Sequence, residues 1–210
     1  MALIPNPYPL CLVTDRSLSN GRALIDIVAA GVRGGVTMVQ LREKHATTRA
    51  FLEEARALKA LLAPRGVPLI INDRVDIALA VDADGVHVGQ TDMPVDQVRA
   101  LIGPDKLIGL SITNQIQMQH NDTTRVDYLG VGPLFLQATK SDASTPLGVN
   151  GFKALRAMTT KPVIAIGGLK PDNSAPVLHA GANGLAVVSA LMAAPDVEAA
   201  ARAFRALSEA

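Results

Sequence analysis

Residues 67–92 read VPLIINDRVDIALAVDADGVHVGQTD, and this stretch decides the fold. It contains two apolar runs, Val67–Ile71 and Gly85–Val88, separated by a short segment with helical spacing. Each run is followed by polar residues that include a carboxylate, Asp73 after the first run and Asp92 after the second. A strand, a helix and a second strand joined by short returns predict a right-handed βαβ crossover with parallel strands.

The same unit recurs along the chain. Six further apolar runs are found at Leu10–Thr14, Thr37–Leu41, Leu107–Leu110, Tyr128–Phe135, Val163–Ile166 and Leu185–Val188. Eight strands that mostly end in polar residues predict a (β/α)8 TIM barrel, an α/β fold with its active site at the carboxyl ends of eight parallel strands. No linker divides the 210 residues, so we expect a single domain over residues 1–210, with a loose N-terminal segment at residues 1–9.

Helical spacing of apolar residues between the runs predicts the outer layer of the barrel. The expected helices run from a cap at Ser19 or Asn20 to Arg33, over Arg49–Leu62, Val75–Val81 and Asp96–Ile102, from a cap at Asn114, and over Asn150–Met158, Asn173–His179 and Asp196–Leu207. The loop Leu136–Val149 is unusually long, which favours a lid over a merely flexible connection.

Composition excludes several classes of function. The 20 basic and 19 acidic residues leave a net charge of +1, so the chain has no general electrostatic attraction for nucleic acid or for an anionic membrane. No apolar run approaches the ~20 residues of a membrane-spanning helix, and the N-terminus has no secretory signal pattern. The single cysteine, Cys11, is expected to be a buried hydrophobe. These features predict a cytoplasmic protein.

Gln40, Arg42 and Lys44 alternate at the end of the second run, so they share one side of an extended segment. Two cations that face the same way repel each other unless an anion lies between them. An Arg fork and a Lys ammonium both suit phosphate oxygens. The alternative is a solvated surface on which Glu43 neutralises the positive charge.

Asp73 and Asp92 follow neighbouring strands, so their carboxylates should meet at the rim. Two such charges about 4 Å apart repel by about 4 kcal/mol at an effective dielectric constant of about 20. A shared proton or a divalent cation would offset this repulsion, and Mg²⁺ commonly takes one or two carboxylates plus water and phosphate oxygens. With Arg42 and Lys44 one strand away, this predicts a metal-bound diphosphate. The alternative is that each Asp caps the following helix.

Other residues also suit a phosphate ligand. Lys140 adds a third cation, and its polar loop favours an electrostatic role over a Schiff base. Gly167-Gly168 lets backbone N–H groups approach a ligand, and with Val188-Ser189 it forms the usual phosphate site of such barrels, the alternative being a tight turn without a ligand. Ser111 is either a hydrogen-bond donor to substrate or a simple turn hydroxyl. His87 is expected to be a packed, hydrogen-bonded histidine.

The strand ends carry a series of motifs in a fixed order. They are Leu12-Val13-Thr14-Asp15, Gln40-Leu41-Arg42-Glu43-Lys44, Asn72-Asp73-Arg74, Gly85-Val86-His87-Val88-Gly89-Gln90 with Asp92, Gly109-Leu110-Ser111, Gly130-Val131-Gly132-Pro133 with Thr139-Lys140, Ala165-Ile166-Gly167-Gly168 and Val187-Val188-Ser189-Ala190. Each motif alone is weak. Together, from Leu12 to Ala190, the series resembles the thiamine-phosphate synthase family, within a superfamily that also holds thiazole tautomerases.

The resemblance implies a transferase that joins an aminopyrimidine methyl diphosphate to a thiazole phosphate, releasing diphosphate and forming thiamine phosphate. It implies pyrimidine-diphosphate contacts from Gln40, Leu41, Arg42, Glu43, Lys44, Asn72, Ser111 and Lys140. Catalytic roles are implied for Arg42, Lys44, Ser111 and Lys140. Magnesium binding is implied for Asp73 and Asp92, and thiazole-phosphate binding for Gln137, Ala138, Thr139, Gly168, Val188 and Ser189. The implied course is dissociative: diphosphate leaves first, and the thiazole nitrogen captures the pyrimidine methylene cation.

One residue departs from the family pattern: Gln137 stands where the family usually has a threonine, so the contact to the thiazole phosphate is expected to differ. Three other functions are alternatives, namely a thiazole tautomerase, a non-catalytic phosphate-binding barrel, and an indole- or sugar-phosphate isomerase. The complete diphosphate set, with both carboxylates and Lys140, favours the synthase. The expected partners are the two small-molecule substrates, and a homo-oligomer is compatible with the sequence.

Overall fold

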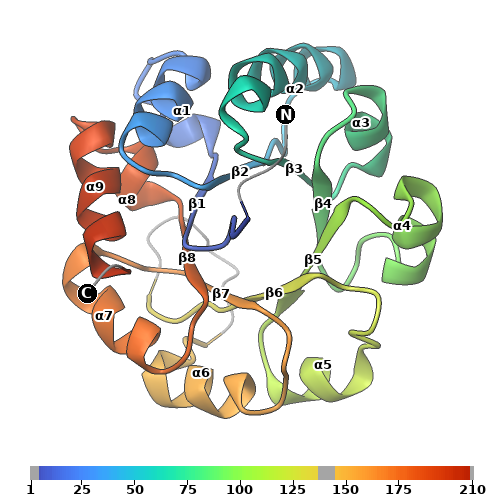
Figure 1. Ribbon diagram of the computed structural model, residues 1–210, viewed down its shortest axis with the longest axis vertical. Helices are drawn as coiled ribbons and strands as arrows, with labels where there is room; N and C mark the ends of the chain where they lie inside the picture. Colours follow the sequence, from blue (N-terminus) through green and yellow to red (C-terminus); the bar gives the residue numbers. More distant parts are fainter. Residues whose placement is uncertain (1–4, 137–144, 209–210) are drawn as a thin grey trace.

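The computed structural model describes residues 5–136 and 145–208, and in them eight strands form a closed parallel barrel (Figure 1). The strands are β1 Leu10–Val13, β2 Met38–Leu41, β3 Leu69–Asn72, β4 Gly85–Val88, β5 Leu107–Ile112, β6 Tyr128–Val131, β7 Val163–Ile166 and β8 Gly184–Val187. Each strand pairs with the next in the chain, and β8 returns to β1 through the pairing of Leu10 with Leu185. The predicted TIM barrel is confirmed.

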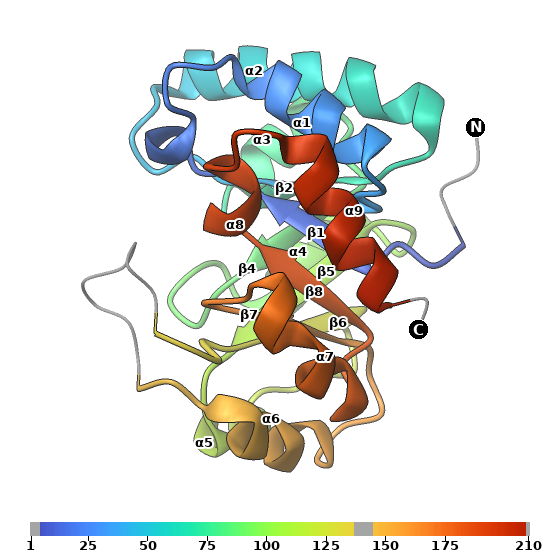
Figure 2. The same cartoon turned by 90° about the vertical axis from the view of Figure 1, so that its left-hand side faces the viewer.

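Helices surround the barrel, as the two views at right angles show (Figures 1 and 2). They are α1 Leu24–Arg33, α2 Thr48–Leu62, α3 Val75–Ala80, α4 Val95–Ile102, α5 Gln115–His120, α6 Gly148–Arg156, α7 Pro171–His179, α8 Ser189–Met192 and α9 Val197–Leu207, with the short 3₁₀ helices η1 Arg16–Leu18 and η2 Ala63–Arg65. None of the described helices combines the length and the apolar character needed to cross a membrane.

Alternation along the strands divides the apolar side chains between two cores. Outward-facing residues such as Leu12 and Leu41 pack against the helices in the larger core. The barrel interior is filled by a smaller cluster of Cys11, Val13, Met38, Ile70, Tyr128, Ile164 and Ala186. Cys11 is buried as predicted, and burial raises the pKa of its thiol to about 12. The thiol is therefore a packing group and not a nucleophile at neutral pH.

The three residues before β1 close the amino end of the barrel. The Tyr8 ring lies 5.7 Å from the Tyr128 ring, measured between centroids, and the Pro9 carbonyl accepts a 3.1 Å hydrogen bond from the Leu185 N–H. The prediction of a loose segment at residues 1–9 is therefore wrong for residues 7–9, because Tyr8 packs against the apolar side chains inside the barrel. Residues 1–4 lie outside the described part.

The first helix begins later than predicted. Asp15 caps η1, and the left-handed backbone at Asn20, with φ of 52°, turns the chain before α1 starts at Leu24. Ser19 is the C-cap of η1, and Asn20 lies in the turn that follows, so neither residue is the N-cap of α1. The cap predicted at Asn114 is confirmed, since its side chain accepts the Gln117 N–H at 2.9 Å.

Strand β6 is shorter than the apolar run that predicted it. The run extends to Phe135, but the strand ends at Val131. Pro133 has no backbone N–H to donate, so the ladder cannot continue through it. Beyond the strand, Leu134 and Phe135 still donate their N–H groups to the carbonyls of Ile166 and Gly167, each at 3.0 Å. Residues 137–144 are not described.

Candidate active site

The residues predicted to bind diphosphate and metal lie at the carboxyl ends of neighbouring strands. Arg42 follows β2, Asn72 ends β3, Asp92 follows β4, and Ser111 lies near the end of β5. Strands β2 to β5 are consecutive hydrogen-bonded neighbours in one parallel barrel. These side chains therefore share one part of the rim, as the strand order predicted.

Arg42 and Lys44 are held by groups from the adjacent strand ends. The Thr14 hydroxyl accepts the Arg42 backbone N–H at 2.9 Å, and the Arg42 guanidinium lies 3.6 Å from the Asp15 carboxylate. The Lys44 ammonium donates to the Asp73 carboxylate at 2.5 Å. Both cations thus have aspartate partners at the rim, whereas the alternative had Glu43 as the neutralising group.

Glu43 and Leu41 face away from the rim cluster. Glu43 pairs with Arg16 at 3.1 Å, and Arg16 also binds Glu54 at 2.6 Å. Burial raises the pKa of the Glu43 carboxyl, although the neighbouring Arg16 acts in the opposite direction. Leu41 is fully buried in the core beneath the helices. The side chains of Leu41 and Glu43 therefore support the loop from behind, and the predicted substrate contacts from these two residues can come only from their backbone.

The carboxyl groups of Asp73 and Asp92 meet, as predicted. Partial burial raises the pKa of Asp92, a hydrogen bond from the Gly89 N–H opposes this, and the neighbouring Asp73 raises the pKa further through a hydrogen bond and its negative charge. The Gly89 N–H donates to Asp92 at 2.7 Å. The Asp73 backbone has φ of 63°, a left-handed conformation that Asp tolerates better than most residues. Like charges are thus held together at this point of the rim.

Neither carboxylate caps a helix. The N-cap of α3 is Arg74 and that of α4 is Pro94, and neither helix start is capped by a side-chain hydrogen bond. The capping alternative is therefore wrong for both Asp73 and Asp92. Their acceptor oxygens are left for Lys44, for the Gly89 N–H and for a ligand.

A chain of buried polar groups crosses the barrel interior beside Ser111. His87 lies between the Tyr128 hydroxyl, 3.0 Å from Nδ1, and the Ser111 hydroxyl, 2.9 Å from Nε2. Burial lowers the pKa of His87 to about 4 and raises that of Tyr128 well above its usual range, while a hydrogen bond with Gln40 acts in the opposite direction. His87 is therefore neutral at pH 7, and the prediction of a packed, hydrogen-bonded histidine is confirmed.

Tyr128 was not predicted to belong to this row of hydrogen-bonded groups. The sequence feature that could have indicated it is the pair of glycines Gly109 and Gly130, which lie on the adjacent strands β5 and β6. A Cβ at Gly109 would lie 2.3 Å from His87 Nδ1, and a Cβ at Gly130 would lie 2.9 Å from His87 Cε1. The glycines leave the space that the imidazole and phenol occupy, so their position opposite a histidine could have indicated a polar barrel interior.

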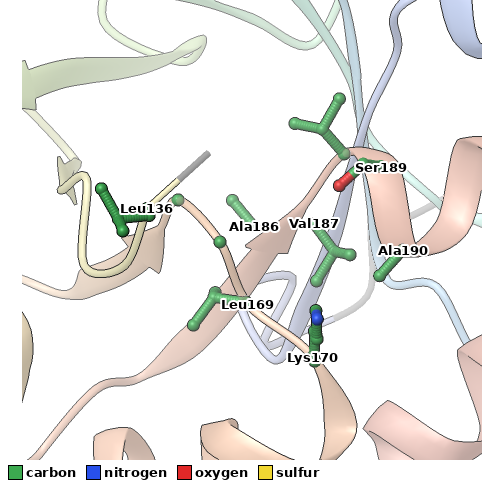
Figure 3. Close-up of a pocket in the computed structure, with 10 residues that line it drawn as sticks. Leu136, Leu169, Lys170, Ala186, Val187, Ser189 and Ala190 are labelled. Atoms are coloured by element: carbon green, nitrogen blue, oxygen red, sulfur yellow. The ribbon is translucent and has the colours of Figure 1, made fainter. Parts of the chain in front are cut away.

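A pocket of about 300 Å³ lies at the ends of β7 and β8 (Figure 3). Its described lining residues are Leu136, Gly167, Gly168, Leu169, Lys170, Ala186, Val187, Val188, Ser189 and Ala190. The structure thus brings Gly168, Val188 and Ser189 together, as the predicted phosphate site requires. Lys170 was not among the predicted residues.

Two parts of the predicted site have no further structural support. Gln137, Ala138, Thr139 and Lys140 lie outside the described residues, as does most of the predicted lid. Within the described ranges, no group of three or more His, Cys, Asp or Glu side chains could hold a metal ion. Any metal at the rim would therefore depend on two carboxylates together with ligands from water or substrate.

Comparison with known proteins agrees with this geometry. Residues 10–191 match the sequence family described as thiamine monophosphate synthase. The chain belongs to this family. A thiamine-phosphate synthase of Chloroflexus aurantiacus is 54% identical over 200 residues, which are 95% of this chain and 92% of the relative. One of Azorhizobium caulinodans is 50% identical over 208 residues, 98% of each chain.

The fold of this family is also known from solved structures. Thiamine phosphate pyrophosphorylase from Pyrococcus furiosus superposes with a TM-score of 0.88 at 36% identity, covering 97% of this chain and 96% of that one. The resemblance and the thiamine-phosphate synthase prediction are confirmed, as is the expectation of a transferase of thiamine biosynthesis that acts on small molecules. The residue roles, the metal and the course of the reaction stay predictions.

Proposed function

We propose that this chain transfers an aminopyrimidine methyl group from its diphosphate to a thiazole phosphate, forming thiamine phosphate and diphosphate. The observation that carries the proposal is that Arg42, Lys44, Asp73 and Asp92 follow the neighbouring strands β2, β3 and β4, with Lys44 paired to Asp73 and Asp73 beside Asp92. Cations beside a contacting pair of carboxylates suit a metal-bound diphosphate. A tautomerase or a passive phosphate-binding barrel would not require this combination.

The donor set fits magnesium. Asp73 and Asp92 present carboxylate oxygens from neighbouring strand ends, and their mutual contact raises the pKa of Asp92 in addition to the effect of burial. A hard divalent cation would remove this unfavourable contact of like charges and leave most of its coordination positions to water and phosphate oxygens. When bound, Mg²⁺ would supply positive charge to neutralise the diphosphate.

The chain's own cations would act on the leaving group. Arg42 presents a planar fork and Lys44 a point charge, and each would gain interaction energy as negative charge builds up on the departing diphosphate. Lys140, outside the described residues, is proposed as a third cation. Preorganised charges of this kind lower the barrier because they need not reorient during the reaction.

Polar groups next to the cations would orient the pyrimidine diphosphate. Gln40 is nearly buried at the end of β2, Asn72 ends β3, and Ser111 is held by neutral His87 at 2.9 Å. Each offers a hydrogen-bond donor, and we propose that they contact the diphosphate or the ring. No general base is required, since the diphosphate leaves first with the electrons of the breaking C–O bond, and the thiazole nitrogen then captures the methylene cation with its own lone pair.

The second substrate would bind at the β7–β8 pocket. Gly168, Val188 and Ser189 line it, and the backbone of Gly168 has φ of 66°, which lets its N–H approach a ligand closely. Gln137, Ala138 and Thr139 are proposed to complete the site. The two proposed substrate sites then lie on the same rim, one at β2 to β5 and one at β7 and β8.

The decisive test mixes the two phosphorylated heterocycles with Mg²⁺ and measures released diphosphate and newly formed thiamine phosphate. We expect equal amounts of both products, and neither product when the thiazole phosphate or Mg²⁺ is omitted. Isomerisation of a thiazole without diphosphate release would favour the tautomerase. A cytoplasmic location and the oligomeric state stay predictions.

A further inference from the structure

The β7–β8 pocket has an uneven distribution of polar groups. Among its described lining residues only Lys170 and Ser189 carry polar side chains, and the others contribute backbone or apolar surface. Figure 3 shows these two side chains coming from different loops, Lys170 from the loop after β7 and Ser189 from the start of α8. Lys170 is therefore the one charged side chain in the described lining.

The backbone of Lys170 is fixed by hydrogen bonds, while its ammonium group has no ion-pair partner among the described residues. The Lys170 N–H donates to the Asn173 Oδ1 at 2.8 Å, and the Lys170 carbonyl accepts from the Ser174 hydroxyl at 2.6 Å. Asn173 also donates to the Gly168 carbonyl at 3.0 Å. In contrast, no carboxylate of the described chain lies within 4.0 Å of the Lys170 ammonium, although other lysines of this protein, such as Lys44, have such partners.

This arrangement gives the pocket two separate means of binding. Asn173 fixes the Gly167-Gly168 loop by donating to the Gly168 carbonyl. The backbone N–H groups of this loop can then donate to any oxygen atom of a ligand. The Lys170 ammonium would add a Coulomb attraction that a phosphate ester would gain and that the corresponding alcohol would not. Because the Lys170 side chain is exposed, loss of this contact should weaken binding of the phosphate about tenfold.

We propose that Lys170 sets the preference of this pocket for a phosphate ester over the corresponding alcohol. The proposal rests on the function proposed above, because it takes the thiazole phosphate as the occupant. Lys170 acts on specificity alone: it lies at the pocket of the second substrate, in the loop after β7, whereas the diphosphate cluster follows β2 to β5. Its loss should change the binding of one substrate and leave the rate of the chemical step unchanged.

The test compares Lys170→Gln with Lys170→Arg and with Lys153→Gln. Lys153 is an exposed lysine on α6 that does not line the pocket, so it controls for the general loss of one positive charge. For Lys170→Gln we expect the KM for the thiazole phosphate to rise about tenfold with kcat unchanged. The kcat/KM for the free thiazole alcohol should not change, and Lys170→Arg should retain the preference.

Binding is measured in parallel by titration calorimetry with the thiazole phosphate and the thiazole alcohol, without the pyrimidine substrate. This readout separates the two proposals, because weaker phosphate binding by Lys170→Gln would support the role of Lys170 even if no product formed. Equal affinities of wild type and Lys170→Gln for the phosphate would overturn it. Equal losses for phosphate and alcohol would also overturn it, as would a wild-type protein that binds neither.

Discussion

Replacing Lys44 with glutamine should separate catalysis from stability. Lys44 makes a 2.5 Å ion pair with Asp73 at the rim, but 46% of its side chain is exposed. Such exposed pairs contribute about 0.2 to 1 kcal/mol to folding, which corresponds to a shift in Tm of about 2–4 °C at most for a chain of this size. The free energy of unfolding of Lys44→Gln should therefore be close to that of the wild type.

The effect on turnover should be much larger. If Lys44 faces the departing diphosphate, its charge acts where negative charge develops in the transition state. Removing one such preorganised donor typically costs about 3 to 4 kcal/mol, or roughly 10² to 10³ in kcat. The assay is steady-state release of diphosphate at saturating Mg²⁺, with Tm measured on the same preparations.

Lys59 provides a matched control at the opposite end of the strands. Its ammonium pairs with Asp84 at 2.7 Å, with only 22% and 13% of the two side chains exposed, and Asp84 also accepts the Leu69 N–H at 2.9 Å. Lys59→Gln should therefore lower the free energy of unfolding by about 2 kcal/mol without changing kcat. Two Lys–Asp pairs of similar geometry should thus give opposite patterns.

Either of two results would refute this reasoning. If the kcat of Lys44→Gln stayed within about threefold of the wild-type value, Lys44 would have no catalytic role, since the expected loss is far larger. Activity that falls in proportion to stability in both variants would mean that Lys44 only supports the fold.

Two further predictions concern the barrel interior and the β7–β8 loop. Because burial lowers the pKa of His87 from 6.5 to about 4, the unfolded chain binds more protons between these values, so wild-type stability should fall by up to about 3 kcal/mol as pH drops through this window. The stability of His87→Gln, measured by urea unfolding at pH 4 to 7, should not show this fall. The prediction would be contradicted if the free energy of unfolding of wild type and variant changed with pH in the same way. Gly168→Ala should lose about 2 kcal/mol of stability and bind thiazole phosphate more weakly, because its Cβ would lie 2.7 Å from the Phe135 Cβ at a φ of +66°. Gly148→Ala, with φ of +61° and no atom within 4 Å of the added Cβ, is the control for backbone strain alone, and equal losses in the two variants would show that the contact with Phe135 is unimportant.

The contact between Asp73 and Asp92 could be predicted because it depends on strand order. In a closed parallel barrel, the third and fourth strands are neighbours, and residues just past their carboxyl ends must lie close together. The same logic brought Gly168 and Ser189 into one pocket. Motifs at strand ends were informative because the barrel leaves them little freedom.

Features that depend on loop paths or side-chain direction could not be predicted in this way. The pairing of Glu43 with Arg16 requires the loops after β1 and β2 to pack against α2. The hydrogen bond between His87 and Tyr128 depends on the register that places each of them opposite Gly109. An alternating strand pattern shows that a residue faces inward, but not which polar group it will meet across the barrel.

The most direct measurement titrates Mg²⁺ with inorganic diphosphate into the wild type and Asp92→Asn by calorimetry. Asparagine can still accept the Gly89 N–H that donates to Asp92 at 2.7 Å, so the variant removes the charge and keeps the local structure. We expect the wild type to bind diphosphate only with Mg²⁺, and the variant to bind the pair about tenfold more weakly or worse. Equal affinities in the two proteins, or wild-type binding that does not depend on Mg²⁺, would contradict a metal-bound diphosphate at this rim.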